Sequence, residues 1–115
     1  MLEIRRKSNE EISKKDIFMM TKNQNISTMK SLENGTRIPV KYWVLFTDLN
    51  RSTGEDVEIL SIMAEDGQVI ATNSNSFKDM FFDIVEILEE TEGFTIEKIG
   101  GKTKAGRDFV TCALV

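Results

Sequence analysis

Apolar and polar residues alternate along the stretch from Arg37 to Thr47. The even-numbered positions are all apolar: Ile38, Val40, Tyr42, Val44 and Phe46. The odd-numbered positions are mostly polar or amphipathic: Arg37, Pro39, Lys41, Trp43, Leu45 and Thr47. A period of two residues is typical of a strand that is buried on one face. We therefore expect the even series to face the core and Trp43 to lie on the exposed face.

Further along the chain the pattern predicts four more strands and one helix. Two strands precede the helix and two follow it, over residues 57–64, 69–72, 94–99 and 107–114. Between Phe77 and Leu88 the apolar residues instead recur at intervals of three and four, which predicts a helix with one buried face. The last two strands are joined by residues 100–106, a basic loop rich in glycine.

This order predicts the fold class. Three strands, a helix and two more strands over residues 36–115 match the chain order of the OB-fold, a small and partly open Greek-key barrel. We predict an all-β barrel with one helix that plugs one end, although an α+β sheet with one covering helix would use the same elements. Residues 1–35 lack this pattern. We interpret them as an N-terminal extension, with a short helix within residues 9–20 followed by a loop.

Composition excludes most catalytic chemistry. The 115 residues make one domain, and they contain no His and a single Cys, Cys112. Imidazole catalysis, an internal disulfide and zinc sites built on Cys or His are therefore excluded. We expect no enzymatic activity, cofactor or metal. No leader sequence and no apolar run long enough to cross a bilayer is present, so we expect a cytoplasmic protein with no membrane partner.

Charge is distributed unevenly. Residues 1–30 hold seven basic and four acidic side chains, whereas residues 31–115 hold eight basic and fifteen acidic ones. Within that acidic part, residues 98–107 contain four basic side chains and no acidic one. Local charge of this kind decides whether a polyanion can bind.

Aromatic residues beside these cations indicate a binding site for single-stranded nucleic acid. Exposed bases stack on aromatic rings while Lys and Arg neutralise the backbone, and a duplex offers no free base faces. In the last strand we expect Cys112 to face inward and Phe109 to face outward. The candidate binding residues are Arg37, Lys41, Trp43, Asn73, Lys98, Lys102, Lys104, Arg107 and Phe109. Stacking accepts DNA and RNA alike, so the sequence leaves that choice open.

Two stretches resemble a known family. Residues 71–77 (ATNSNSF) and 101–112 (GKTKAGRDFVTC) are similar to small phage-encoded single-stranded-DNA-binding proteins of Gram-positive hosts. The resemblance covers most of residues 15–115. It implies a non-enzymatic accessory of replication or recombination in the host cytoplasm, and it assigns Phe109 and the loop from Lys102 to Arg107 to the DNA. Many single-strand binders recruit replication or recombination proteins through an acidic tail, but this sequence ends in a predicted strand.

A second hypothesis starts from the acidic residues of the predicted helix. Asp79, Asp83, Glu86, Glu89, Glu90 and Glu92 lie mainly opposite its apolar stripe. Such a face is typical of a solvated helix, and it would also suit an acidic protein-interaction module or an inhibitor of a host nucleic-acid enzyme. The sequence leaves open whether the chain associates with itself, and whether residues 1–35 act as a swapping arm, a lid or a recruitment element.

Overall fold

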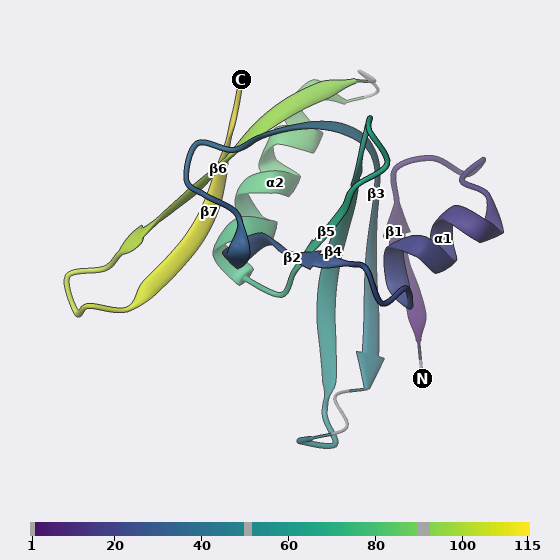
Figure 1. Ribbon diagram of the computed structural model, residues 1–115, viewed down its shortest axis with the longest axis horizontal. Coiled ribbons are helices and arrows are strands. Elements are labelled where there is room, and N and C mark those ends of the chain that lie inside the picture. The colour runs from purple at the N-terminus through teal and green to yellow at the C-terminus, as the bar shows by residue number, and fades with distance from the viewer. Residues whose placement is uncertain (1, 50–51, 90–92) are drawn as a thin grey trace.

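The computed structural model describes residues 2–49, 52–89 and 93–115 (Figure 1). In chain order its elements are β1 (Glu3–Lys7), α1 (Lys14–Thr21), β2 (Ser27–Thr28), η1 (Met29–Ser31), β3 (Arg37–Leu49), β4 (Asp56–Ala64), β5 (Val69–Thr72), α2 (Asn75–Leu88), β6 (Phe94–Lys102) and β7 (Asp108–Leu114). The five predicted strands are present as β3 to β7, and the predicted helix is present as α2. Two strands in the first thirty-five residues, β1 and β2, were not predicted.

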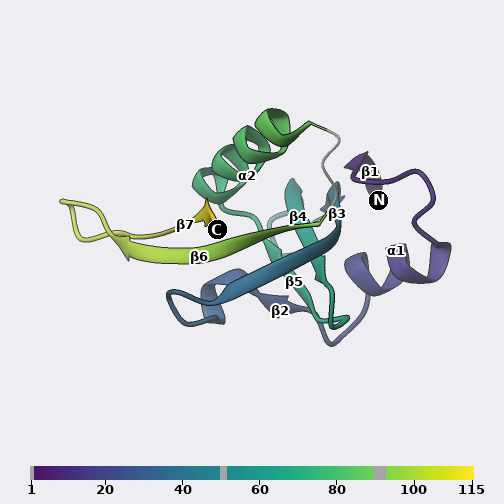
Figure 2. The same ribbon diagram turned by 90° about the horizontal axis from the view of Figure 1, so that it is seen from above.

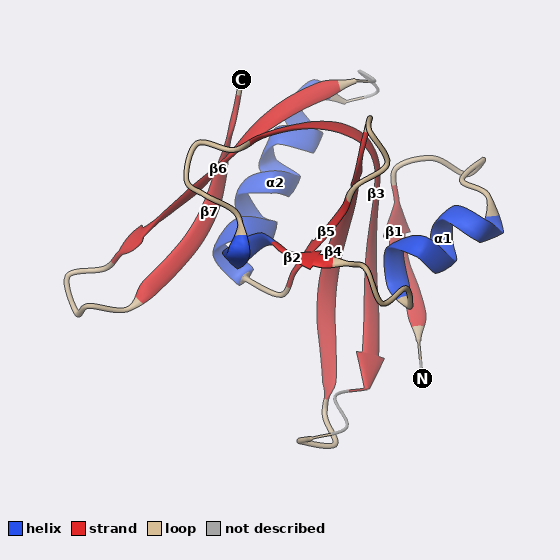
Figure 3. Ribbon diagram, in the orientation of Figure 1, coloured by secondary structure: helices blue, strands red, loops and turns tan. Residues whose placement is uncertain are grey.

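The strands form a single curled sheet around the long strand β3 (Figure 3). The order across the sheet is β2-β5-β4-β3-β6-β7, and β1 pairs with β3 as well. The first residues of β3, Arg37–Val40, pair with β6, whereas β1 pairs with β3 near its other end, at Val44–Thr47. The β5 edge pairs with the two-residue strand β2, so within the described chain β5 and β7 do not close the barrel. The predicted class, an OB-like all-β fold with one helix after the third of its five strands, is confirmed as a half-open barrel.

A β-bulge in β3 overturns the predicted facing of Trp43. Val40 pairs with Ala64 and Tyr42 pairs with Met63, so β3 holds one extra residue at this point. An extra residue shifts the two-residue period by one and exchanges the two faces. Beyond the bulge it is Trp43 and not its even-numbered neighbours that turns toward α2, and the residue is only 6% exposed. The prediction held as far as Val40 and was wrong after it.

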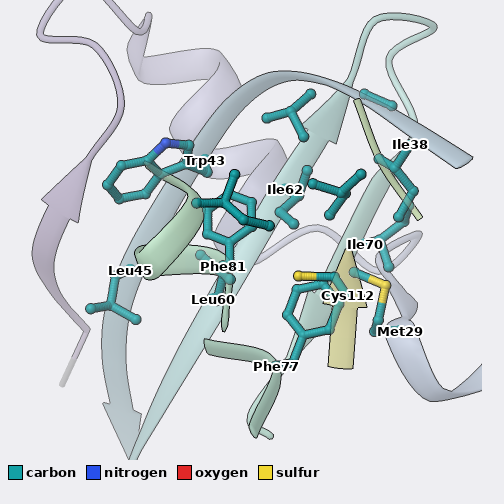
Figure 4. Close-up of a cluster of buried hydrophobic side chains, with 14 residues drawn as sticks. Met29, Ile38, Trp43, Leu45, Leu60, Ile62, Ile70, Phe77, Phe81 and Cys112 are labelled. Atoms are coloured by element: carbon teal, nitrogen blue, oxygen red, sulfur yellow. The ribbon is translucent and has the colours of Figure 1, made fainter. Parts of the chain in front are cut away.

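The main core lies between the sheet and α2 (Figure 4). Phe77 and Phe81 of α2 are fully buried, and the Trp43 ring meets Phe81 edge-on at a centroid distance of 6.0 Å. Ser74 fixes the start of the helix, because its Oγ accepts from the Phe77 backbone N–H (3.3 Å) and donates to the carbonyl oxygen of Val110 (3.2 Å). The start of α2 is therefore bonded directly to β7.

The N-terminal residues build a second core on the opposite face of the sheet, where α1 packs (Figure 2). Ser13 caps α1 by accepting from the Asp16 N–H at 3.1 Å, and the predicted short helix is thereby confirmed. Met20 of α1 is fully buried beside Val44, and Met29 is fully buried in the main core. The division after residue 35 stays a prediction, while β1 and β2 contribute strands to the same sheet.

Cys112 lies inside the main core, as predicted, and is 2% exposed. Burial raises the pKa of its thiol to about 12, since a thiolate would lack solvation there. The side chain therefore acts as a small apolar residue. None of the helices in the described ranges is both long and apolar enough to span a bilayer.

Candidate nucleic-acid interface

A cleft of about 500 Å³ opens where the barrel is not closed, between the start of α2, the β6–β7 hairpin and the segment before β3. We call it the basic cleft. Its polar lining consists mainly of three lysines and two asparagines, Lys30, Lys98, Lys102, Asn34 and Asn73. Phe109 and one acidic residue, Asp108, complete one wall. The cleft thus combines an aromatic ring with amides and an excess of positive charge.

Phe109 keeps its position because residue 101 is glycine. Gly101 and Phe109 are cross-strand partners in β6 and β7, and their side-chain positions fall on one face of the hairpin. A Cβ atom on Gly101 would lie 2.8 Å from Cζ of the Phe109 ring, so only glycine leaves room for the ring to rest on the β6 backbone. The phenylalanine is still 38% exposed. The structure therefore agrees with the predicted outward facing of Phe109.

Lys98 is not the free cation that its position in the sequence suggested. The side chain is buried, and its ammonium donates to the carbonyl oxygen of Leu32 (2.7 Å) and to Oδ1 of Asn34 (3.1 Å). Gly100 makes this contact possible, since a Cβ there would lie 2.6 Å from the same Oδ1. Lys98 therefore holds the segment before β3 against β6, and two of its three donors are already used.

The loop between the last two strands is shorter than predicted. β6 extends to Lys102 and β7 begins at Asp108, so residues 103–107 alone form the connection, which we call the hairpin tip. Within it the Thr103 N–H donates to the Arg107 carbonyl at 2.8 Å, and Gly106 adopts a φ of 80°. The hairpin projects well beyond the body of the molecule in both views (Figures 1 and 2).

The cations at the end of the hairpin form no ion pair with any residue that the structure describes. Lys102, Lys104 and Arg107 are exposed, and within the described ranges none of them takes part in an ion pair. Lys30, at the opposite side of the cleft, is also exposed and forms no ion pair with a described residue. Cations without internal partners keep their full charge for a polyanion.

The remaining predicted residues lie elsewhere. Arg37 is exposed on β3, and its Nε lies 3.8 Å from the Glu97 carboxylate. Lys41 is exposed above the ring of Tyr42, at 5.5 Å from its centroid. Lys41 and Trp43 line a different groove and not the basic cleft. The structure therefore brings together Asn73, Lys98, Lys102 and Phe109, places Lys104 and Arg107 on the adjoining tip, and separates Arg37, Lys41 and Trp43 from them.

Sequence reasoning missed Lys30 and Asn34. Both come from residues 1–35, which the pattern described only as an extension, and they reach the cleft because β2 pairs with β5 and Lys98 binds Asn34. The sequence Asn34-Gly35 indicates a turn, but nothing in it indicates which strand the turn approaches.

The groove that contains Lys41 and Trp43 has a volume of about 890 Å³, and we call it the acidic groove. Four glutamates line it, Glu10, Glu11, Glu65 and Glu89, around an apolar floor that includes Trp43 and Phe94. Lys41 is the one cation among its described lining residues. On α2, Asp79, Asp83 and Glu86 are exposed as predicted, whereas Glu90 and Glu92 lie outside the described residues.

A family model of phage single-stranded DNA-binding proteins, of the Phi29 type, matches residues 8–115. Neither the curated proteins nor the solved structures contain a match to the chain. The family match covers every residue that lines the basic cleft. It confirms the predicted resemblance to phage single-strand binders, while the Gram-positive host stays a prediction. The chain belongs to the phage single-stranded DNA-binding protein family.

Proposed function

We propose that the protein binds single-stranded DNA with little sequence preference, by stacking bases on Phe109 and by neutralising the backbone with the cations around the basic cleft. The partner, single-stranded DNA, follows from the family. Assignment of the contact to this cleft and hairpin is our proposal. Such binding serves phage replication or recombination, the processes in which single strands are exposed, and it requires no catalytic step.

The observation that carries the proposal is the position of the Phe109 ring. It is 38% exposed, it rests on Gly101, and it lines the basic cleft together with Lys102 and the amides of Asn34 and Asn73. A base stacked on this ring would place its phosphates within reach of exposed ammonium groups on both sides, since Lys30 lines the opposite wall. Every base has a π-face, which makes such stacking tolerant of sequence.

Replacement of the ring provides the first test. Phe109→Ala should weaken binding to a labelled oligo-dT by about 1–3 kcal/mol in a fluorescence anisotropy titration, because one base–aromatic stack is lost. Phe109→Tyr keeps a ring and should bind like the wild type. Phe18→Ala is the matched control, since Phe18 is an exposed phenylalanine (56%) on α1, away from the cleft. Equal affinity of the Phe109→Ala and Phe18→Ala variants would reject the role of Phe109.

Salt dependence tests the cations separately. The triple variant Lys102→Ala, Lys104→Ala, Arg107→Ala should bind more weakly. The negative slope of log affinity against log salt should also become shallower by about two, because each neutralised phosphate of a single strand contributes about 0.7 to its magnitude. An unchanged slope would show that these side chains do not contact the backbone.

A further inference from the structure

Exposed apolar side chains gather along one side of α2 and at the end of β7. Seven large apolar side chains are exposed in the described chain, and four of them lie here: Met80, Ile87, Leu114 and Val115. Ile87 is 81% exposed, which is the highest value of the seven. Single exposed apolar residues are ordinary, whereas a group of them marks an interaction site. We call these four residues the apolar flank.

The two α2 residues of the apolar flank lie on the side of the helix that borders β7. Met80 and Ile87 are two helical turns apart and therefore share one side of α2. The nearly opposite side faces other strands, because Lys78 donates to a carbonyl oxygen of β4 at 3.1 Å and the ring of Phe82 meets that of Trp43 in β3. β7 packs along α2, and its end lies beside the helix in both views (Figures 1 and 2). The apolar flank thus follows the line along which α2 meets β7.

Three acidic side chains border the apolar flank on the outer side of α2, namely Asp79, Asp83 and Glu86. All three are exposed, and none forms an ion pair with any residue that the structure describes. The one basic residue of α2, Lys78, is buried and bonded to β4 instead. Aliphatic surface and negative charge without an internal partner therefore lie side by side.

This combination restricts what can cover the surface. Nucleic acid and anionic lipid would be repelled by the carboxylates, and a second copy would bring the same three negative charges to the contact. A strand cannot add to the middle of the β7 edge, since Cys112 there is only 2% exposed. Two apolar side chains a heptad apart instead match a helix, whose apolar residues recur along one face. A helix with basic residues beside that face would complement the carboxylates.

We propose that the apolar flank binds a basic amphipathic helix of another protein, with the partner's aliphatic side chains on the flank and its lysines or arginines opposite the three α2 carboxylates. None of these residues of the chain lines the basic cleft. DNA and the partner helix therefore use separate surfaces, and the contact does not depend on the proposed function.

A synthetic peptide is the probe for this contact. It has about 14 residues, with leucine at the positions that form one face of a helix and lysine at the others. Fluorescence anisotropy of the labelled peptide should show binding to the full chain that weakens as salt is raised, because the carboxylates attract its lysines. A peptide with the same residues in scrambled order, and one with glutamate in place of lysine, should each bind at least about tenfold more weakly.

Removal of the aliphatic side chains tests the apolar part of the contact. Met80→Ser/Ile87→Ser should bind the leucine–lysine peptide at least about tenfold more weakly, because the apolar area that the peptide covers is lost. Phe18→Ser/Leu49→Ser is the matched control, since it removes two exposed apolar side chains elsewhere and should bind the peptide like the wild type. Circular dichroism checks that each variant is folded, and Met80→Ser/Ile87→Ser should keep its affinity for oligo-dT.

Neutralisation of the acidic side chains tests the electrostatic part. The α2 variant Asp79→Asn/Asp83→Asn/Glu86→Gln should bind the peptide about tenfold more weakly and with a shallower dependence on salt. The control Glu33→Gln/Glu55→Gln/Glu65→Gln changes the net charge equally, at exposed carboxylates outside α2, and should bind the peptide like the wild type.

Three results would overturn the proposal. Peptide binding that is no stronger than that of the scrambled peptide, or that persists in Met80→Ser/Ile87→Ser, would show that the apolar flank is not the contact. Equal losses in the two charge variants would show attraction to net charge alone. A change in the sedimentation of the protein by itself on Met80→Ser/Ile87→Ser substitution would show that a second copy covers this surface.

Discussion

The basic cleft and the acidic groove are built from similar parts and differ in how those parts are used. Each contains an aromatic side chain, charged residues and the start or end of β6. In the basic cleft Phe109 is 38% exposed and rests on Gly101, whereas in the acidic groove Trp43 is 6% exposed, packs on Phe81 and Phe82, and is covered on its face by the Arg6 guanidinium. An aromatic ring with nearby cations is therefore insufficient evidence for base stacking. The exposed area of the ring decides whether a base can stack on it.

The same contrast holds for the charged groups. Lys98 and Lys102 lie four residues apart on β6, but the ammonium of Lys98 is bound by Leu32 and Asn34, while Lys102 is exposed. Bound cations stabilise the fold, and unpaired ones remain available for a ligand. Four predictions test this distinction between structural and available groups.

The largest expected effect is the loss of stability when Trp43 is replaced. Trp43→Ala should lower the free energy of unfolding by about 3–5 kcal/mol, because it leaves a cavity beside Phe81 in the main core. Urea denaturation measures this loss. The conservative variant Trp43→Phe should be much less destabilised, and under conditions where it is folded it should bind oligo-dT like the wild type. A large loss of DNA affinity in a folded Trp43→Phe protein would erase the contrast between the two rings.

The second-largest expected effect is the loss of stability when Lys98 is replaced. Lys98→Met removes the ammonium that binds Leu32 and Asn34, and leaving these acceptors without their donor should cost about 1–3 kcal/mol of stability. Lys102→Met is the matched control, and it should leave the denaturation midpoint unchanged while weakening DNA binding. If both variants behave alike in both assays, the two lysines do not differ as the structure indicates.

A smaller effect is expected at Gly101. A methyl group in Gly101→Ala would lie within 3 Å of the Phe109 ring and should displace it, which we expect to lower oligo-dT affinity by about tenfold or less. In the Phe109→Ala background the same substitution should have no further effect. Such a double-mutant cycle isolates the contact, and additive losses would show that Gly101 acts independently of the ring.

The smallest change concerns fluorescence. The single tryptophan, Trp43, is buried away from the basic cleft, so saturating oligo-dT should alter its emission little even though anisotropy of the labelled DNA reports binding. Strong quenching at saturation would place DNA at the acidic groove.

Much of the fold followed from hydrophobic periodicity, and the exceptions have physical causes. The strands β3 to β7 were predicted from apolar and β-branched runs with alternation, and α2 was predicted from its helical apolar stripe. β1 was missed because its sequence, Glu3 to Lys7, is mostly charged, and β2 because two residues carry no period. The bulge in β3 was invisible, since both faces of that strand are buried and either register looks apolar.

For the candidate site, chain order placed several of the predicted residues near one another but gave no information about their environments, and their role in DNA binding stays a prediction. Asn73, Lys102 and Phe109 lie where chain order placed them, around one cleft. Lys98 and Trp43 were misjudged because burial depends on partners distant in sequence, namely Asn34 for Lys98 and Phe81 for Trp43. Lys30 reaches the cleft only through pairing of β2 with β5, a long-range contact without a local pattern.

The extra residue in β3 makes the length of this strand a stricter requirement than its composition. Deleting Lys41 would only remove the bulge, because Trp43 would keep its partner Ile62, but inserting one residue directly after Tyr42 would exchange the two faces of the strand beyond it, so that Val44 would face α2 and Trp43 would face α1. Both apolar layers would then receive side chains of the wrong size at the same time. Insertions of one residue after Tyr42 should consequently be far rarer in evolution than substitutions, and insertions of two residues should be the tolerated step.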